Sequence, residues 1–185
     1  MANMLLEPPF AANPPVKLNV NAKILGLVIG ILALIGAVFG GLVGGLFSLF
    51  SLAAGGFGGI WLIGILISLI ADVIGAIGGF QMYSGNRAGK NLVIYALALG
   101  FLGSIVGAIG NIVAYSGIYT LGGYSAGGAI VGLIFGVIVY GIIYYIVVIS
   151  RWPGDVPLVA AGPTGGYGNP PGGYGSPPPP PPPSA

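Results

Sequence analysis

Charged residues are scarce in this chain: its 185 residues include five basic and three acidic side chains. Soluble domains place charge at about a quarter of their positions, so a chain this poor in charge could not cover a surface in water. Apolar residues make up 56% of it, and the mean hydropathy is +1.01. We therefore predict an integral membrane protein whose main solvent is the lipid bilayer. Five basic residues also form too small a positive surface for nucleic acid, so no nucleic-acid partner is expected.

Cysteine and histidine are missing altogether. Without cysteine the chain has no disulfide, no thiolate nucleophile and no thiolate metal ligand. Without histidine it lacks the commonest metal ligand and the side chain that most often moves protons near neutral pH. We therefore expect no metal site, no cofactor and no catalytic residues, because the remaining acids are too few to form an acid–base pair.

Proline is absent between Pro15 and Pro153, although the chain has 16 prolines. An interior proline removes a backbone hydrogen bond that lipid cannot replace, so its absence favours uninterrupted helices. About 20 helical residues cross the hydrocarbon core of a bilayer. We therefore predict an all-α polytopic fold with four transmembrane helices in two hairpins. Their expected ranges are about 24–50, 58–82, 91–115 and 127–150, within a domain of residues 24–150.

The two flanking segments differ in composition from this domain. Residues 1–23 contain four prolines before a long apolar run, which predicts an extended arm leading into a retained membrane anchor. Residues 151–185 are rich in proline, glycine and tyrosine, which predicts a disordered tail. Proline-rich segments that contain tyrosine can dock into aromatic grooves, so a binding partner of this tail is expected.

The basic residues all fall on one side of the predicted helices. Lys17 and Lys23 precede the first helix, Arg87 and Lys90 lie between the second and third, and Arg151 follows the fourth. Basic residues concentrate in the cytoplasmic loops of membrane proteins. We therefore predict a multi-pass protein of the cell (cytoplasmic) membrane with both termini in the cytoplasm.

Glycine recurs at four-residue spacing within the predicted helices. Small residues at this spacing let helix backbones approach closely in lipid, where no hydrophobic effect drives helices together. The expected packing positions are Gly36, Gly40, Gly44, Gly103, Gly107, Gly128, Gly132 and Gly136. These stripes predict a tightly packed bundle. Alternatively, some of them face outward and drive association with a second copy or with other membrane subunits, and the first helix is the candidate for that interface.

Asp72 is the only acidic or basic residue inside a predicted span. Because it shares a helix face with Ser68 at four-residue spacing, we expect it to face a packing surface rather than lipid. At about 1.5 Å per residue it lies near mid-membrane, at the depth of Ser104 and Tyr140, which are the predicted hydrogen-bond partners. Asn111 lies nearer the outer side, so direct pairing with Asp72 is not expected.

Asp72 leaves two functional hypotheses open. If the carboxyl group is protonated and ties helices together, the chain is a non-enzymatic scaffold or accessory subunit whose tail recruits a partner. If the carboxyl group exchanges protons or cations, the chain is a small proton- or cation-coupled transporter or channel. A site completed by another subunit is a third arrangement.

Three low-complexity motifs also carry a family resemblance: the run from Lys23 to Gly36, residues 76–79 before the basic turn, and residues 88–90 opening the next helix. Over about residues 20–150 the chain resembles an uncharacterised family of small four-helix bacterial membrane proteins, known only as a domain of unknown function. The resemblance implies the four-helix fold and brings no activity or catalytic residues. The tail is similar to those of tetraspanning vesicle proteins of the MARVEL type.

Overall fold

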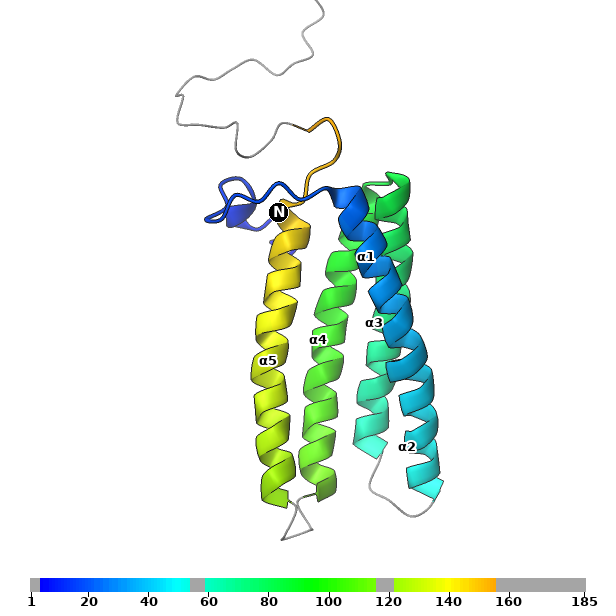
Figure 1. The fold of residues 1–185 in the computed structure, drawn as a ribbon. Coiled ribbons are helices and arrows are strands. Elements are labelled where there is room, and N and C mark those ends of the chain that lie inside the picture. The colour runs from blue at the N-terminus through cyan, green and yellow to red at the C-terminus, as the bar shows by residue number, and fades with distance from the viewer. Residues whose placement is uncertain (1–3, 54–58, 116–121, 156–185) are drawn as a thin grey trace, which may run out of the picture.

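The computed structural model describes residues 4–53, 59–115 and 122–155 (Figure 1). Within these ranges every regular secondary-structure element is helical, and four helices are long and apolar enough to cross a membrane. These spans are Ala22–Phe50, Gly59–Ser84, Ala88–Val113 and Gly127–Ile149. They confirm the predicted all-α fold with four transmembrane helices. Most of the predicted disordered tail lies outside the described residues.

The first span is built from three consecutive helical segments. The helix α1, Ala22–Ile35, continues through a π-helical segment η2, Gly36–Val43, into α2, Gly44–Ala53. The remaining spans are α3, Gly59–Ser84, α4, Ala88–Tyr115, and α5, Gly122–Ile149. α5 begins earlier than predicted, because a pair of glycines does not end a helix where lipid leaves the backbone no other hydrogen-bond partner.

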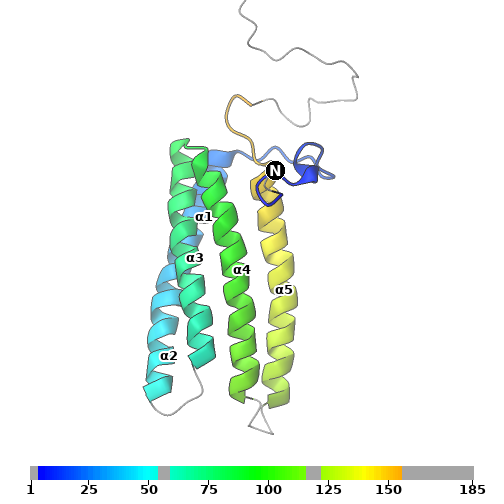
Figure 2. The same cartoon turned by 180° about the vertical axis from the view of Figure 1, so that it is seen from behind.

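The four spans form an open bundle. α3 packs on one side against the first span and on the other against α4, and α5 packs mainly against α4. Figures 1 and 2 show α5 beside α4 and separated from α1 in both views. The most extensive contact joins α3 and α4 across the basic turn. The predicted tightly packed bundle is therefore wrong for α5, which packs on α4 and leaves one side of α3 and the first span uncovered.

Close backbone contacts hold the first span, α3 and α4 together. A Cβ atom added to Gly79 would lie 2.5 Å from the backbone nitrogen of Gly30. A Cβ atom on Gly89 would lie 2.5 Å from the carbonyl oxygen of Gly78. No side chain fits at such distances, so glycine at these positions permits the contact that the small-residue motif predicts for helices in lipid.

The buried apolar core lies at the end of the bundle where α1 begins and α5 ends. Its residues come from all four spans: Ala22, Met82, Val93, Ile94, Val147 and Val148. Large apolar side chains farther along the helices, such as Phe39 and Phe135, stay exposed, as expected for surfaces that face lipid.

The basic residues come together at this same end, as the predicted topology requires. Lys23 lies against Gly85 in the α3–α4 turn, where a φ of 94° requires glycine. The Lys90 ammonium donates to the carbonyl oxygens of Val148 (2.7 Å) and Ser150 (3.2 Å) at the end of α5. We call this the basic end. Lys90 thereby satisfies carbonyl groups that the end of a helix leaves without partners.

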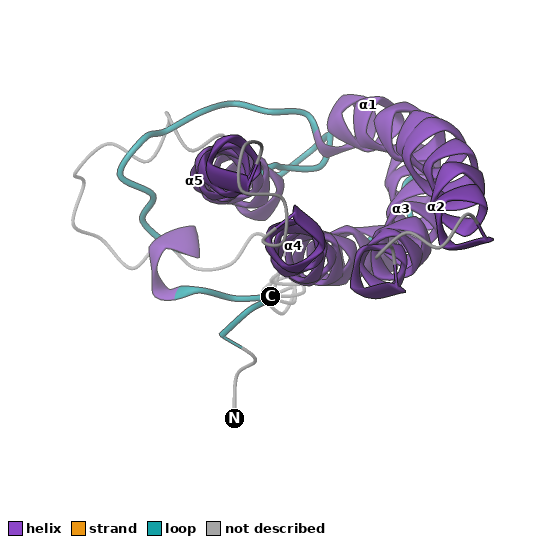
Figure 3. Ribbon diagram, turned by 90° about the horizontal axis from the view of Figure 1, so that it is seen from below, coloured by secondary structure: helices purple, strands orange, loops and turns teal. Residues whose placement is uncertain are grey.

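The N-terminal arm is docked against α5, which corrects the predicted extended arm. The Tyr144 hydroxyl donates to the Leu5 carbonyl, and the Tyr145 hydroxyl donates to the Val16 carbonyl, both at 2.7 Å. The Phe10 ring lies 5.5 Å from the Tyr145 ring. Figure 3 shows the arm passing around the end of α5 before it enters α1. Two tyrosines near the end of α5 thus hold a segment whose prolines alone suggested an extended arm.

Candidate functional site

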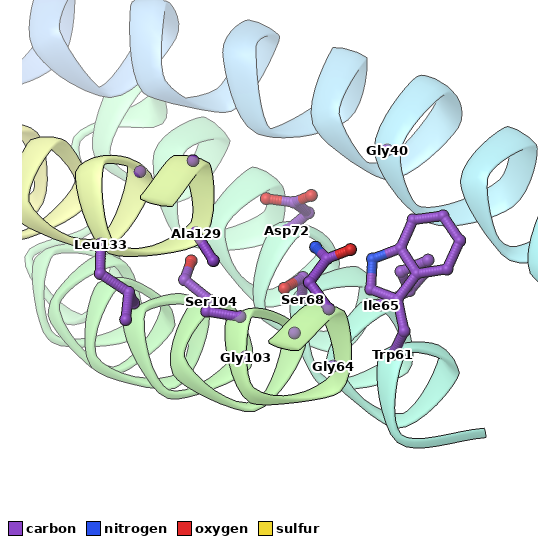
Figure 4. Close-up of a pocket in the computed structure, with 15 residues that line it drawn as sticks. Gly40, Trp61, Gly64, Ile65, Ser68, Asp72, Gly103, Ser104, Ala129 and Leu133 are labelled. Atoms are coloured by element: carbon purple, nitrogen blue, oxygen red, sulfur yellow. The ribbon is translucent and has the colours of Figure 1, made fainter. Parts of the chain in front are cut away.

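A cleft of about 560 Å³ opens where α5 leaves α3 and the first span uncovered (Figure 4). All four spans contribute to its walls. The lining residues are Gly40, Trp61, Gly64, Ile65, Ser68, Asp72, Gly103, Ser104, Gly107, Ala108, Asn111, Gly128, Ala129, Gly132 and Leu133. Four of the five predicted polar site residues, all except Tyr140, therefore belong to one cavity.

Helical spacing explains why these polar side chains share the cleft. On α3, Trp61, Ser68 and Asp72 lie at separations of seven and four residues, which returns them to one face of a helix. On α4, Ser104 and Asn111 are seven residues apart and likewise share a face. The close contact between α3 and α4 joins the two faces side by side, so the polar groups meet in the apolar part of the molecule.

Asp72 points toward the first span. A Cβ atom on Gly36 would lie 2.8 Å from its Oδ2 atom, so the missing side chain of Gly36 makes room for the carboxyl group. Figure 4 shows the carboxyl group between α3 and the helix that carries Gly40, with the Trp61 ring farther along that space. Gly36 also opens the π-helical segment η2, a departure from α-helical geometry that is frequent at functional sites.

The predicted hydrogen bonds from Asp72 to Ser104 and Tyr140 are not formed. The Ser104 hydroxyl donates instead to the carbonyl oxygen of Gly100, one turn earlier, at 3.0 Å. The Tyr140 hydroxyl lies over Gly100, and its ring packs 5.9 Å from the Phe101 ring. Tyr140 and Asp72 do line a second cavity of about 70 Å³ together. The Ser104 hydroxyl is thus satisfied within its own helix, and Tyr140 contacts α4 instead of bonding Asp72.

Asp72 makes no hydrogen bond or ion pair with any other described residue, and no side-chain hydrogen bond is formed by Ser68 or Asn111 within those residues. The cleft is open, so these groups are not sealed away from contact. An unpaired polar group in an apolar environment costs free energy. The cleft therefore carries hydrogen-bonding groups that the described residues leave unused.

Glycines line opposite walls of the cleft without any neighbour. Gly128 and Gly132 of α5 and Gly40 of η2 have no atom within 4 Å of an added Cβ, and the same holds for Gly136. The prediction that these four glycines pack against other helices of the chain is therefore wrong, because α5 stays away from α1 and α3. Gly103 and Gly107 do pack against α3, while Gly44 makes only an ordinary contact with Ile65.

The sequence prediction did not assign Trp61 or Gly64 to the site. Both share the helix face of Ser68 and Asp72, so the spacing that identified Asp72 could also have identified them. No group of three acidic residues that could hold a metal ion occurs in the described part of the chain. Asp72 is the one charged side chain that lines the cleft.

Comparisons with models of known protein families, with curated proteins and with solved structures found no match to this chain. The resemblance to an uncharacterised four-helix family remains a prediction.

Proposed function

We propose that this protein is a non-enzymatic scaffold or accessory subunit of a membrane assembly, and that the cleft receives a transmembrane helix from another subunit. The observation that carries this proposal is the pair of unfilled glycine surfaces, Gly40 on one wall and Gly128 with Gly132 on the other. A helix surface without side chains allows another backbone to approach closely, and van der Waals contact is the main attraction between helices in lipid.

The polar groups of the cleft give such a helix a further attraction. Asp72, Ser68 and Asn111 have hydrogen-bonding capacity that their own chain does not use. Polar side chains that bond between helices add about 0.6–2 kcal/mol each to association in a bilayer. A partner helix with a donor near mid-membrane would satisfy Asp72 and cover the glycine walls at the same time.

The same proposal places the basic end, the N-terminal arm and the tail of residues 151–185 in the cytoplasm. The concentration of lysine and arginine at one end of the bundle supports this orientation. The tail would then recruit a cytoplasmic partner, and deletion of residues 153–185 should remove that partner from the purified complex.

Single-cysteine variants test the cleft directly, because the natural chain has no cysteine. Gly132→Cys, labelled in its native membrane with a benzophenone maleimide and irradiated, should yield one protein adduct of defined mass. Gly127→Cys is the matched control: it is another α5 glycine with no neighbour within 4 Å, but it does not line the cleft. Adducts with lipid alone at Gly132→Cys would contradict the proposal.

A second candidate function is proton- or cation-coupled transport through the cleft. It is supported by the carboxyl group of Asp72, which is unpaired and shares the cleft with Ser68, Ser104 and Asn111. Asp72→Asn keeps the size of the side chain and should abolish a pH- or cation-driven flux in proteoliposomes. Glu7→Gln, which removes an acid outside the spans, should not. Equal flux in wild type and Asp72→Asn would contradict transport.

A further inference from the structure

Two more cavities lie between α4 and α5, one above the other at the basic end. The first has about 480 Å³ and is lined by charged residues, among them Arg87, Lys90 and Arg151. The second has about 550 Å³ and is lined almost wholly by apolar and aromatic side chains. Neither cavity belongs to the cleft around Asp72, and no residue of the predicted site lines either one except Tyr140 and the topology residues.

The two cavities follow each other along both helices. On α4, Asn91 lines the charged cavity and Ile94 lines the apolar one. On α5, Val148 and Tyr144 have the same relation, four residues apart. Three to four residues are one helical turn, or about 5.4 Å. A molecule with a polar head and an apolar chain could therefore occupy both cavities at once.

The side chains that line the charged cavity favour an anion. Asp155 is already engaged, since Oδ1 accepts from Arg87 at 3.1 Å and Oδ2 accepts from the Trp152 backbone N–H at 2.9 Å. Arg87 also lies 5.9 Å from the centre of the Trp152 ring. The Arg151 guanidinium makes no hydrogen bond to a described residue.

Lys90 and Arg151 are thus opposed by one further acid, the exposed Glu7. Lys90 donates two hydrogen bonds to carbonyl oxygens and retains a third N–H. Arg151 can offer a planar fork of N–H groups, the geometry that suits phosphate oxygens. The cavity therefore has an excess positive charge and unused donors at the level where lipid headgroups lie.

The apolar cavity has the surface that an acyl chain requires. Phe101 and Tyr140 contribute rings to its wall, and Gly141 leaves space on α5, with no atom within 4 Å of an added Cβ. The arm closes over it, because Leu5 lines this cavity and its carbonyl oxygen is bound by Tyr144.

We propose that the basic end binds one anionic phospholipid, with its phosphate at Arg151 and Lys90 and an acyl chain in the apolar groove between α4 and α5. Basic pockets between transmembrane helices are the type of site that holds anionic headgroups. This inference does not depend on the proposed role of the cleft. The lipid would join α4, α5 and the N-terminal arm on the side of the molecule away from the first span.

Native mass spectrometry of the full chain, released from nanodiscs with equal parts of phosphatidylglycerol, phosphatidylethanolamine and phosphatidylcholine, tests the proposal. The wild type should retain one phosphatidylglycerol molecule in preference to the other lipids. Arg151→Gln should retain it about tenfold less, because a hydrogen bond to a charged group is lost. Gly141→Leu should also reduce retention by filling the groove, whereas Gly127→Leu, at the other end of α5, should not.

Three outcomes would overturn the proposal: equal retention of phosphatidylcholine, preferential retention of phosphatidylethanolamine, or wild-type retention in both Arg151→Gln and Gly141→Leu. Added glycerol phosphate separates a lipid site from a simple phosphate site. If it displaces the bound lipid at equal concentration, the acyl groove contributes nothing and the site is one for free phosphate.

Discussion

The glycines of α3 and those of α5 follow the same four-residue spacing but have opposite surroundings. Gly75 and Gly79 of α3 lie against atoms of neighbouring helices, and a Cβ on Gly79 would reach within 2.5 Å of Gly30. Gly132 and Gly136 of α5 have no neighbour within 4 Å. In the most apolar stretch of each span, 22% of the residues are buried in α3 and 6% in α5. A small-residue stripe thus allows close packing, but a second helix has to be present for the packing to occur.

The two regions also differ in what holds them. The first span, α3 and α4 are held by backbone contact along much of their length. α5 is held mainly at the basic end, where Lys90 binds its last carbonyl groups and the arm binds Tyr144 and Tyr145. Farther along, Gly128 and Gly132 of α5 line the cleft and have no atom within 4 Å of an added Cβ. The first span, α3 and α4 are therefore closely packed on one another, whereas α5 leaves a glycine surface without a neighbouring helix.

The largest effect is expected where a side chain enters the closest backbone contact. Gly79→Leu would place a side chain where Gly30 now lies, so α1 and α3 must separate. We expect a loss of about 3 kcal/mol or more, at the upper end of overpacking effects. Reversible unfolding in mixed micelles, followed by circular dichroism, measures this change. Unchanged stability would show that the contact between α1 and α3 does not hold the fold together.

A smaller effect is expected at the basic end. Lys90→Met keeps the length of the side chain but removes the donors that bind the Val148 and Ser150 carbonyl oxygens. Hydrogen bonds from a charged donor contribute about 1.5–3 kcal/mol, so α5 should become easier to detach. Hydrogen exchange should rise in the last turn of α5 and stay unchanged in α3. If the variant leaves the exchange rate in the last turn of α5 unchanged, or raises it equally in α3, this role for Lys90 is contradicted.

The smallest effect on monomer stability is expected on the open face of α5. Gly132→Leu adds a side chain where no atom lies within 4 Å, so the free energy of unfolding of the isolated chain should change by less than about 0.5 kcal/mol. In the native membrane the same variant should lose its partner, because the leucine fills the cleft. Gly127→Leu should keep both stability and partner. A large loss of stability in Gly132→Leu would mean that α5 packs on α3 in the bilayer.

The sequence located the four spans because length and hydropathy are local properties. The proline-free interval and the apolar runs predicted helices that the structure has at nearly the same residues. The same reasoning placed Lys23, Arg87, Lys90 and Arg151 at one end, since every second crossing returns the chain to the same side. The sequence also identified four polar residues that share helix faces and line one cleft in the structure: Ser68, Asp72, Ser104 and Asn111.

The pairing of these surfaces was decided by the tertiary structure. Gly36, Gly103 and Gly132 look alike in the sequence, yet the first two have neighbours and the third has none. Asp72 was expected to bond Ser104 and Tyr140, but the Ser104 hydroxyl donates to the Gly100 carbonyl and the Tyr140 hydroxyl lies over Gly100. Periodicity describes one helix at a time, whereas a contact depends on the positions of two. The sequence therefore determined which helix faces carry glycine and polar residues. The tertiary structure, in which α5 packs against α4 and not against α3, determined which of those faces remained open.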